Sequence, residues 1–126
     1  MRAVDTNVLV RLIARDDPRQ VAAAELFVAD GAWVSHLALA ETIWVLATVY
    51  EVTPDALCTV IDGLLNHRSL TLQDRDVVRA ALDHFRQKPK VGFSDCLMLE
   101  VAAKAGHRPL GTFDRDLSKL PQTHRL

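Results

Sequence analysis

Apolar residues recur along the chain at two spacings, which together predict short strands that alternate with helices. In several segments the apolar positions are three or four residues apart, as on one face of a helix. Short runs with strong β-propensity lie between these segments. The expected strands cover 2–4, 32–35, 70–72 and 109–113, and the tail adds a last short strand. Three helices are expected to begin at residues 6, 18 and 54, and three more are expected over 37–50, 74–86 and 94–105.

Capping residues indicate where several of these helices begin and end. Asp17 followed by Pro18 combines a favoured N-cap with a proline at the first helical position. Asp30 and Gly31 end the helix that follows, because glycine tolerates the left-handed conformation of a helix end. Ser94 is expected to cap the last helix.

Strands that alternate with helices are typical of a parallel sheet covered on both faces, so the predicted fold class is α/β. The 126 residues contain no linker, repeat or low-complexity tract, which predicts a single domain over 1–126. In such sheets chemistry collects beyond the carboxyl ends of the strands. The residues that follow strands are therefore the first candidates for a functional site.

Composition and charge narrow the class of protein. Hydrophobic residues make up 49% of the chain and charged residues 25%, the balance of an ordinary globular protein. That balance excludes a disordered, collagen-like or disulfide-stapled chain. The 15 basic and 16 acidic side chains leave a formal net charge of −1. Taken alone, this charge argues against a nucleic-acid partner, because phosphate binding usually requires a basic excess.

The cysteines and the apolar runs bear on the cellular compartment. Cys58 and Cys96 each lie in an apolar, helix-like stretch without a CxxC partner, so we expect buried thiols in a reducing compartment. Asp5 leaves no room for the apolar region of a signal peptide. The longest apolar run, from Ile43 to Val49, is far too short to span a membrane. These features predict a cytoplasmic protein with no membrane partner.

Four acids stand out by their positions. Asp5 follows the first expected strand and Asp114 follows a late one, whereas Asp95 lies at the start of an expected helix. Capping, the helix dipole and turn formation each give these three a structural explanation. Glu41 is surrounded by apolar neighbours and is not a cap. Because a buried, unpaired charge is costly, we expect Glu41 at a rim or beside a compensating positive charge.

One arrangement explains the four acids together, namely convergence around a cation. Converging carboxylates raise one another's pKa values unless a cation lies among them. Oxygen ligands of this kind suit Mg²⁺ or Mn²⁺, and a pair of such ions can activate water and stabilise the leaving oxygen of a phosphodiester. No competing site is visible: the histidines lack zinc-ligand spacing, and neither a GxSxG motif nor a phosphate-binding glycine loop occurs.

Four short motifs carry these acids in order and give the chain a family resemblance. The motifs are VDTNVL at 4–9, AETIWVL at 40–46, FSDCL at 93–97 and GTFD at 111–114. Each motif is weak alone, whereas the four in this order and at these spacings are more specific. Over essentially the whole chain the residues resemble the PIN-domain ribonucleases, and the length resembles the VapC-type toxins of toxin–antitoxin pairs.

This resemblance implies a three-layer α/β/α sandwich on a mainly parallel sheet of about five short strands. It also implies a metal-dependent endoribonuclease that uses Mg²⁺ or Mn²⁺. Asp5, Glu41, Asp95 and Asp114 match the family's acidic quartet. Asp5 and Asp95 would be the most direct metal ligands, with Glu41 and Asp114 completing the site.

The resemblance extends to positioning residues and partners. Asn7 and Thr112 match polar positions that help to place ligands, water or phosphate. Asp116 is an alternative to Asp114 as the fourth acid, and the sequence leaves that choice open. The implied partners are an RNA substrate, a small cognate antitoxin and a second copy of the chain in a homodimer.

Two other classes of function remain open on the sequence: aspartate-dependent phosphoryl transfer and a non-enzymatic binding module. A phosphatase that forms an aspartyl-phosphate would show Asp-x-Asp after the first strand, whereas Asp5 is followed by Thr6 and Asn7. A receiver-like domain would require a lysine after a late strand, which 109–113 does not supply. A non-enzymatic helical binding module would treat all the acids as caps, and Glu41 argues against it.

The net charge of the chain no longer argues against a nucleic-acid partner once the four candidate acids are counted separately. The remaining residues carry 15 basic against 12 acidic side chains, a net charge of +3. A whole-chain value of −1 therefore averages an acidic site with a mildly basic surround. We expect RNA to meet that surround.

Overall fold

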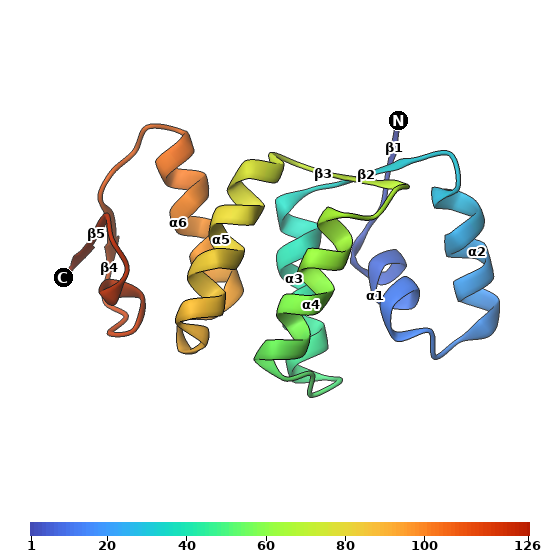
Figure 1. Cartoon of the computed structure of the whole chain (residues 1–126), viewed down its shortest axis with the longest axis horizontal. Helices are drawn as coiled ribbons and strands as arrows, with labels where there is room; N and C mark the ends of the chain where they lie inside the picture. Colours follow the sequence, from blue (N-terminus) through green and yellow to red (C-terminus); the bar gives the residue numbers. More distant parts are fainter. The chain divides into compact units, whose positions relative to one another are not determined.

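Short strands and helices alternate through the chain, as the apolar pattern predicts (Figure 1). The computed structural model describes all 126 residues, and they form two compact units, Met1–Arg75 and Asp76–Leu126. We call these the N-terminal unit and the C-terminal unit. The elements up to residue 72 are β1 (Arg2–Ala3), α1 (Thr6–Ala14), α2 (Pro18–Val28), β2 (Ala32–Val34), α3 (His36–Thr48), α4 (Pro54–Leu65) and β3 (Leu70–Leu72).

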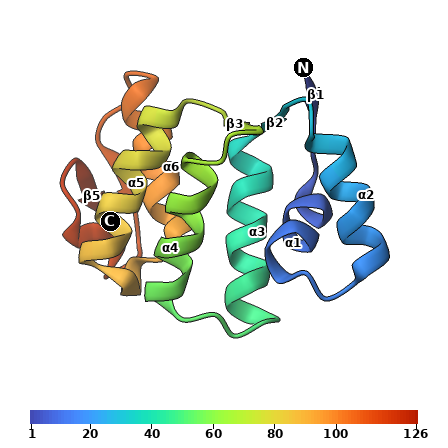
Figure 2. The ribbon, with the colours of Figure 1, turned by 45° about the vertical axis from the view of Figure 1, so that its right-hand side comes forward.

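The N-terminal unit contains a three-stranded sheet in the order β1-β2-β3, with every pairing parallel. Ala32 of β2 is the register partner of both Arg2 in β1 and Leu70 in β3. Because the strands are parallel, their carboxyl ends share one edge of the sheet. Helix α1 packs against α2 and against α3 (Figure 2). The residues that follow β1 therefore lie where the sheet edge meets these helices.

Side-chain caps begin the four helices of this unit. Each capping oxygen accepts a hydrogen bond from the backbone N–H three residues further on, which satisfies a donor that the helix itself cannot. A cap of this kind contributes about 1 kcal/mol to stability. The four caps are Asp5, Asp17, Ser35 and Thr53.

The core of the N-terminal unit consists of aliphatic side chains from the helices and strands. Leu9, Leu39 and Ile61 are at most 1% exposed. The one buried polar residue is Thr42, whose hydroxyl donates to the Ala38 carbonyl at 2.7 Å within α3. Since that hydroxyl has a partner, its burial carries no large penalty.

The C-terminal unit is built on two helices and a pair of parallel strands. The rings of Phe85 and Phe93 pack edge to face at 6.0 Å between centroids and join its two helices. Strands β4 and β5 pair in parallel, with Leu110 opposite Thr123. The elements are α5 (Arg75–Gln87), which begins at the last residue of the N-terminal unit, η1 (Pro89–Val91), α6 (Phe93–Lys104), β4 (Leu110–Thr112), η2 (Leu117–Lys119) and β5 (Thr123–Arg125).

The last long helix begins earlier than its sequence indicates. Helix α6 starts at Phe93, and its N-cap position is Gly92, with a positive φ of 87° and no side-chain cap bond. Ser94, expected to be the cap, lies inside the first turn instead. That prediction is wrong, because the helix already includes Phe93, which is 3% exposed and packs against Phe85 of α5.

The observed strands support the predicted α/β fold class. There are five short strands, every pairing is parallel, and they divide into a three-stranded and a two-stranded sheet. The expectation of one domain over 1–126 stays a prediction. None of the helices is long and apolar enough to cross a membrane.

Candidate active site

Asp5 occupies the position that the sheet topology favours for chemistry. It follows β1 directly and is the N-cap of α1, where its Oδ1 accepts from the Val8 N–H at 3.1 Å. The cap explanation and the site explanation are compatible, because a carboxylate has a second oxygen and Asp5 is exposed.

Asp5 and Asn7 both line a cleft at helices α1 and α2. The cleft has a volume of about 660 Å³. Its wall combines carboxylates, amides, a guanidinium, small apolar side chains and an aromatic ring. The lining residues are Asp5, Asn7, Val8, Arg11, Asp17, Gln20, Ala23, Ala24 and Phe27.

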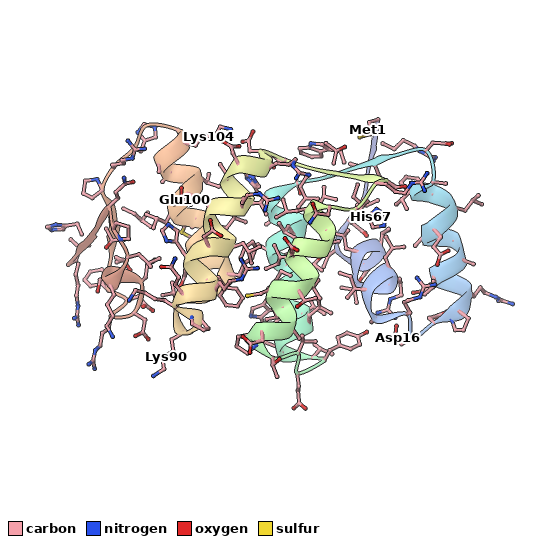
Figure 3. The ribbon with its side chains drawn as sticks, in the orientation of Figure 1. Met1, Asp16, His67, Lys90, Glu100 and Lys104 are labelled. Carbon is pink, nitrogen blue, oxygen red and sulfur yellow. The ribbon has the colours of Figure 1, made fainter.

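Arg11 is the cation of this cleft, and three hydrogen bonds connect its network. Its Nη1 lies 2.6 Å from Asp16 Oδ1, and its Nη2 donates to the Tyr50 hydroxyl at 3.1 Å. Tyr50 in turn donates to Asp16 Oδ2 at 2.8 Å. This hydrogen bond and the Arg11 charge lower the pKa of Asp16. Asp16 lies in the connection between α1 and α2 (Figure 3).

Sequence reasoning missed Arg11 and Phe27 as site residues, although a signal was present. Arg11 is four residues after Asn7, so the two share one face of α1. Gln20 and Phe27 are seven residues apart and likewise share one face of α2. The helical spacing therefore indicates one common wall, once the two helices are known to pack together.

Glu41 lies in the second turn of α3 and is exposed. Its neighbours Thr42 and Ile43 turn into the core instead. Of the two expectations for Glu41, a rim position or a compensating charge, the structure shows an exposed position. Glu41 is not part of the cleft wall that contains Asp5.

Asp95 is the third residue of α6, and it is half-buried. Burial raises the pKa of Asp95, and the negative charge of Asp114 raises it further. Neither carboxylate forms an ion pair with a basic side chain. The C-terminal unit thus brings two acids near one another without a counter-charge.

The residues after β4 hold Asp114 in place. Its backbone N–H donates to Thr112 Oγ1 at 2.9 Å, and its Oδ1 accepts from the Leu117 N–H at 2.8 Å, at the start of η2. Asp116 instead pairs with Lys119, with 3.6 Å between Oδ1 and Nζ. Of the two candidates for the fourth acid, Asp114 is the one whose charge acts on Asp95.

The donor set fits a hard divalent cation. Asp95 and Asp114 are oxygen donors whose mutual repulsion a cation would relieve. Asp5 and Glu41 belong to the N-terminal unit, whereas Asp95 and Asp114 belong to the C-terminal unit. The structure contains no group of three or more His, Cys, Asp or Glu side chains arranged to hold a metal ion. Convergence of all four acids therefore stays a prediction.

A second, smaller cavity in the C-terminal unit is basic. Its volume is about 320 Å³, and three lysines line it together with Asp116. Two arginines of α5 are engaged within the protein: Arg75 donates to the Leu65 carbonyl, and Arg86 Nη1 lies 3.8 Å from Asp83 Oδ1. The lysines of the cavity are Lys88, Lys90 and Lys119.

The cysteines and histidines do not build a competing site. Cys58 and Cys96 are buried, as expected, and form no disulfide, and burial raises the pKa of Cys96 to about 12, so its thiol stays protonated. His84 Nε2 lies 2.7 Å from Glu100 Oε1 on α6 (Figure 3). His36 Nε2 is buried without a hydrogen-bond partner.

Comparison with known proteins gives one match. A protein-family model described as PIN domain matches residues 2–122, which cover most of each unit and include all the candidate acids. No curated protein and no solved structure matches the chain. The family match and the parallel strands together confirm the expected PIN-like α/β fold class.

Proposed function

Since the chain belongs to the PIN-domain family, we propose that it is a metal-dependent endoribonuclease that hydrolyses phosphodiester bonds of RNA. The family supports a nuclease, and hence a hydrolase, as the general kind of function. The choice of RNA, the internal cleavage and the use of Mg²⁺ or Mn²⁺ are our proposals.

The observation that carries the proposal is the pair formed by Asp95 and Asp114. Two carboxylates near one another, with the pKa of Asp95 raised and no basic partner, destabilise the folded chain unless they serve a ligand. The structural role of Asp114, which accepts from the Leu117 N–H, leaves the raised pKa of Asp95 unexplained. We assign both residues to the reaction centre, together with Asp5 and Glu41.

In this proposal the residues of the chain position the substrate and move a proton. Water adds to phosphorus, the bond from phosphorus to the leaving ribose oxygen breaks, and that oxygen takes up a proton. Glu41 is exposed and is our candidate to accept the proton that the attacking water loses. Asn7 and Thr112 place ligands, water or phosphate around the acids.

Asp5 and Asp95 are the proposed direct ligands of the divalent ion, with Glu41 and Asp114 completing the set. When bound, such an ion supplies positive charge to the reacting phosphate and makes water more acidic. Oxygen-only ligands favour Mg²⁺ or Mn²⁺ over softer metals.

We further propose that this nuclease is the toxin of a toxin–antitoxin pair of VapC type. The length of the chain and the four motifs in order support this assignment. A small antitoxin and a second copy of the chain are its proposed partners. A cytoplasmic location agrees with two buried thiols that form no disulfide, which suit a reducing compartment.

The decisive experiment measures RNA cleavage with EDTA, with Mg²⁺ and with Mn²⁺. We expect the wild type to cut only with metal, and Asp5→Asn and Asp95→Asn to cut at least about a hundredfold more slowly. Asp30→Asn and Asp83→Asn are matched controls, one on each unit, that remove an exposed carboxylate outside the proposed site. Equal rates for all variants would exclude the four acids as the reaction centre.

The toxin assignment needs its own test. Expression of the wild type should arrest growth, and Asp95→Asn should not. Sequencing of the flanking DNA should find a small reading frame just upstream, whose product suppresses the arrest. A chain that cleaves RNA without such a neighbour would be a nuclease outside a toxin–antitoxin pair.

A further inference from the structure

The cleft that contains Asp5 offers more than a hydrolytic site requires. Its volume of about 660 Å³ falls within the range of small-molecule sites. All its lining residues belong to the N-terminal unit, so the cleft is defined by that unit alone. Val8, Ala23 and Ala24 are its apolar lining residues beside Phe27, and the other lining residues are polar or charged.

Phe27 is an aromatic surface fixed at the wall of this cleft. The Arg2 guanidinium lies 4.0 Å from the centroid of the Phe27 ring and donates to the Phe27 carbonyl at 3.0 Å. This cation–π contact covers one face of the ring and restrains it. Arg2 is not among the lining residues. Phe27 is one of the lining residues and therefore adjoins any ligand that enters the cleft.

Two amide side chains at the cleft have no partner within the protein. Asn7 lies in the first turn of α1 and Gln20 in the first turn of α2, and neither side-chain amide forms a hydrogen bond with another residue. Each amide offers both donors and an acceptor. Such groups read the edge of a nucleobase, which presents donors and acceptors in the same plane.

Arg11 adds a charged donor whose position is fixed. Asp16 and Tyr50 hold its guanidinium, and the side chain is 21% exposed. The fork has further N–H groups beyond these two bonds, and a guanidinium fits a phosphate well. The acids Asp5 and Asp17 also line the cleft, so charge alone does not draw phosphate into it.

We propose that this cleft is a nucleotide subsite that takes one unpaired base of the RNA substrate. The base packs against Phe27, its edge faces the amides of Asn7 and Gln20, and Arg11 donates to the phosphate of the same nucleotide. The subsite adjoins Asp5, so it deepens the proposed ribonuclease function and rests on it. Its consequence is a preference for certain bases beside the cut bond.

The chemistry of the cleft favours an unpaired base over a helical RNA segment. In a duplex the base faces are stacked and the base edges are paired, so an aromatic ring and amides at a cleft wall have nothing to contact. A base in a loop or a single strand presents both its face and its edge. The proposed substrate is therefore a single-stranded or looped RNA.

The test measures RNA binding in the presence of Mg²⁺ by fluorescence anisotropy, on an Asp95→Asn parent that leaves the RNA uncut. The probes are labelled single strands of each of the four bases and one duplex. We expect Phe27→Leu to weaken binding of the preferred strand by about tenfold, and Phe27→Tyr to stay within about twofold of the parent. Leu26→Ala, on the same helix and 78% exposed, is the control and should bind normally.

Gln20→Ala gives a second readout that does not touch the core. We expect it to change the ranking of the four strands and to leave the melting temperature unchanged, since the Gln20 side chain is exposed. Phe27→Leu and Gln20→Ala that both bind all four strands as the parent does would overturn the subsite. The cleft would then serve another ligand, such as a segment of a partner protein.

Cleavage of RNA by the wild type distinguishes failure of the subsite proposal from failure of the ribonuclease proposal. If the wild type cleaves RNA with metal, and Phe27→Leu cleaves it at the same rate and with the same base preference, only the subsite is wrong. If neither the wild type nor Leu26→Ala cleaves any RNA, the ribonuclease proposal itself is wrong, and the subsite falls with it.

Discussion

Asp95 is a residue whose ionised form opposes folding. Burial and the charge of Asp114 raise its pKa in the folded chain above the ordinary aspartate value. The folded state therefore holds the proton more tightly than the unfolded state. The contribution of Asp95 to stability is fully present below the unfolded pKa and is lost as pH rises through the folded pKa.

Replacing this carboxylate by a neutral group should stabilise the metal-free protein. We expect Asp95→Asn in EDTA to melt about 1–3 °C above the wild type near neutral pH. The difference should vanish in acid, where Asp95 itself is protonated. Excess Mn²⁺ should raise the melting temperature of the wild type more than that of the variant, since only the wild type keeps the ligand. A variant that melts lower than the wild type in EDTA at neutral pH would contradict this explanation.

The pKa of Asp16 is shifted in the opposite direction to that of Asp95. The hydrogen bond from Tyr50, followed by the Arg11 charge, lowers its pKa in the folded chain. Its contribution to stability is present above the unfolded pKa and is lost as pH falls through the lower folded value. Tyr50→Phe removes the hydroxyl that connects Asp16 to Arg11.

We expect Tyr50→Phe to melt about 1–2 °C below the wild type at neutral pH, with a smaller difference in strong acid. Thermal unfolding at the two pH values checks this. Thr59→Val is the control, because the Thr59 hydroxyl bonds only the Asp55 carbonyl of its own helix, and its effect should not depend on pH. A pH-independent loss in Tyr50→Phe would show that Asp16 gains nothing from this bond.

At the level of helices and strands, most boundaries could be predicted because local chemistry sets them. Asp17 with Pro18 begins α2 as expected, and the alternation around Thr71 does form β3. The start of α6 was missed because a side-chain cap contributes about 1 kcal/mol, whereas burying a phenylalanine contributes about 1.5–3 kcal/mol. Burial of Phe93 therefore decides where α6 begins, and a single segment does not reveal that burial.

Asp5 combines a structural role in α1 with a proposed role in the reaction, and two substitutions separate them. Asparagine is as good an N-cap as aspartate, whereas alanine is not. We expect Asp5→Asn to keep the stability of the wild type and Asp5→Ala to lose about 1 kcal/mol in denaturant unfolding. Both should lose RNA cleavage. Loss of cleavage in Asp5→Ala alone would mean that Asp5 acts only through the helix.

At the scale of the whole molecule, the net charge of −1 divides unequally between the units. The N-terminal unit has six basic and ten acidic residues, a net charge of −4, and the C-terminal unit has nine basic and six acidic residues, a net charge of +3. Lys88 and Lys90 of the basic cavity lie in the second group. In the sequence, the residues other than the four candidate acids carry a net positive charge. The division into units places the excess of basic residues in the C-terminal unit.

This division predicts which residues carry the salt dependence of RNA binding. We expect Lys88→Ala with Lys90→Ala to weaken binding of single-stranded RNA and to reduce the slope of log Kd against log salt by about 1.4. Anisotropy titrations at several salt concentrations measure the slope. Arg68→Ala, an exposed arginine of the N-terminal unit, should leave it unchanged. An unchanged slope in the double variant would remove the basic cavity from the RNA-binding surface.

The candidate acids could be predicted from the sequence because their positions after strands and at helix starts are local features. Arg11 and Phe27 could not be predicted as site residues, because their place in the cleft depends on how helices α1 and α2 pack together. The interpretation of Glu41 also changed. Its apolar neighbours in the sequence suggested a buried charge that requires a positive partner, whereas the side chain is exposed in the structure. Its exposure removes the physical reason to require a cation there, so its proposed role depends on the family match.

The most direct test of the proposed acidic quartet is a double-mutant cycle on single-turnover RNA cleavage with Mn²⁺. Asp5→Asn alters the N-terminal unit and Asp95→Asn the C-terminal unit. When two residues act in the same step, removing one already abolishes most of the rate enhancement that the other supports. We therefore expect each single variant to slow cleavage at least about a hundredfold and the double variant to be little slower than either. Single variants that cleave at the wild-type rate, or losses that multiply in the double variant, would contradict the proposed quartet.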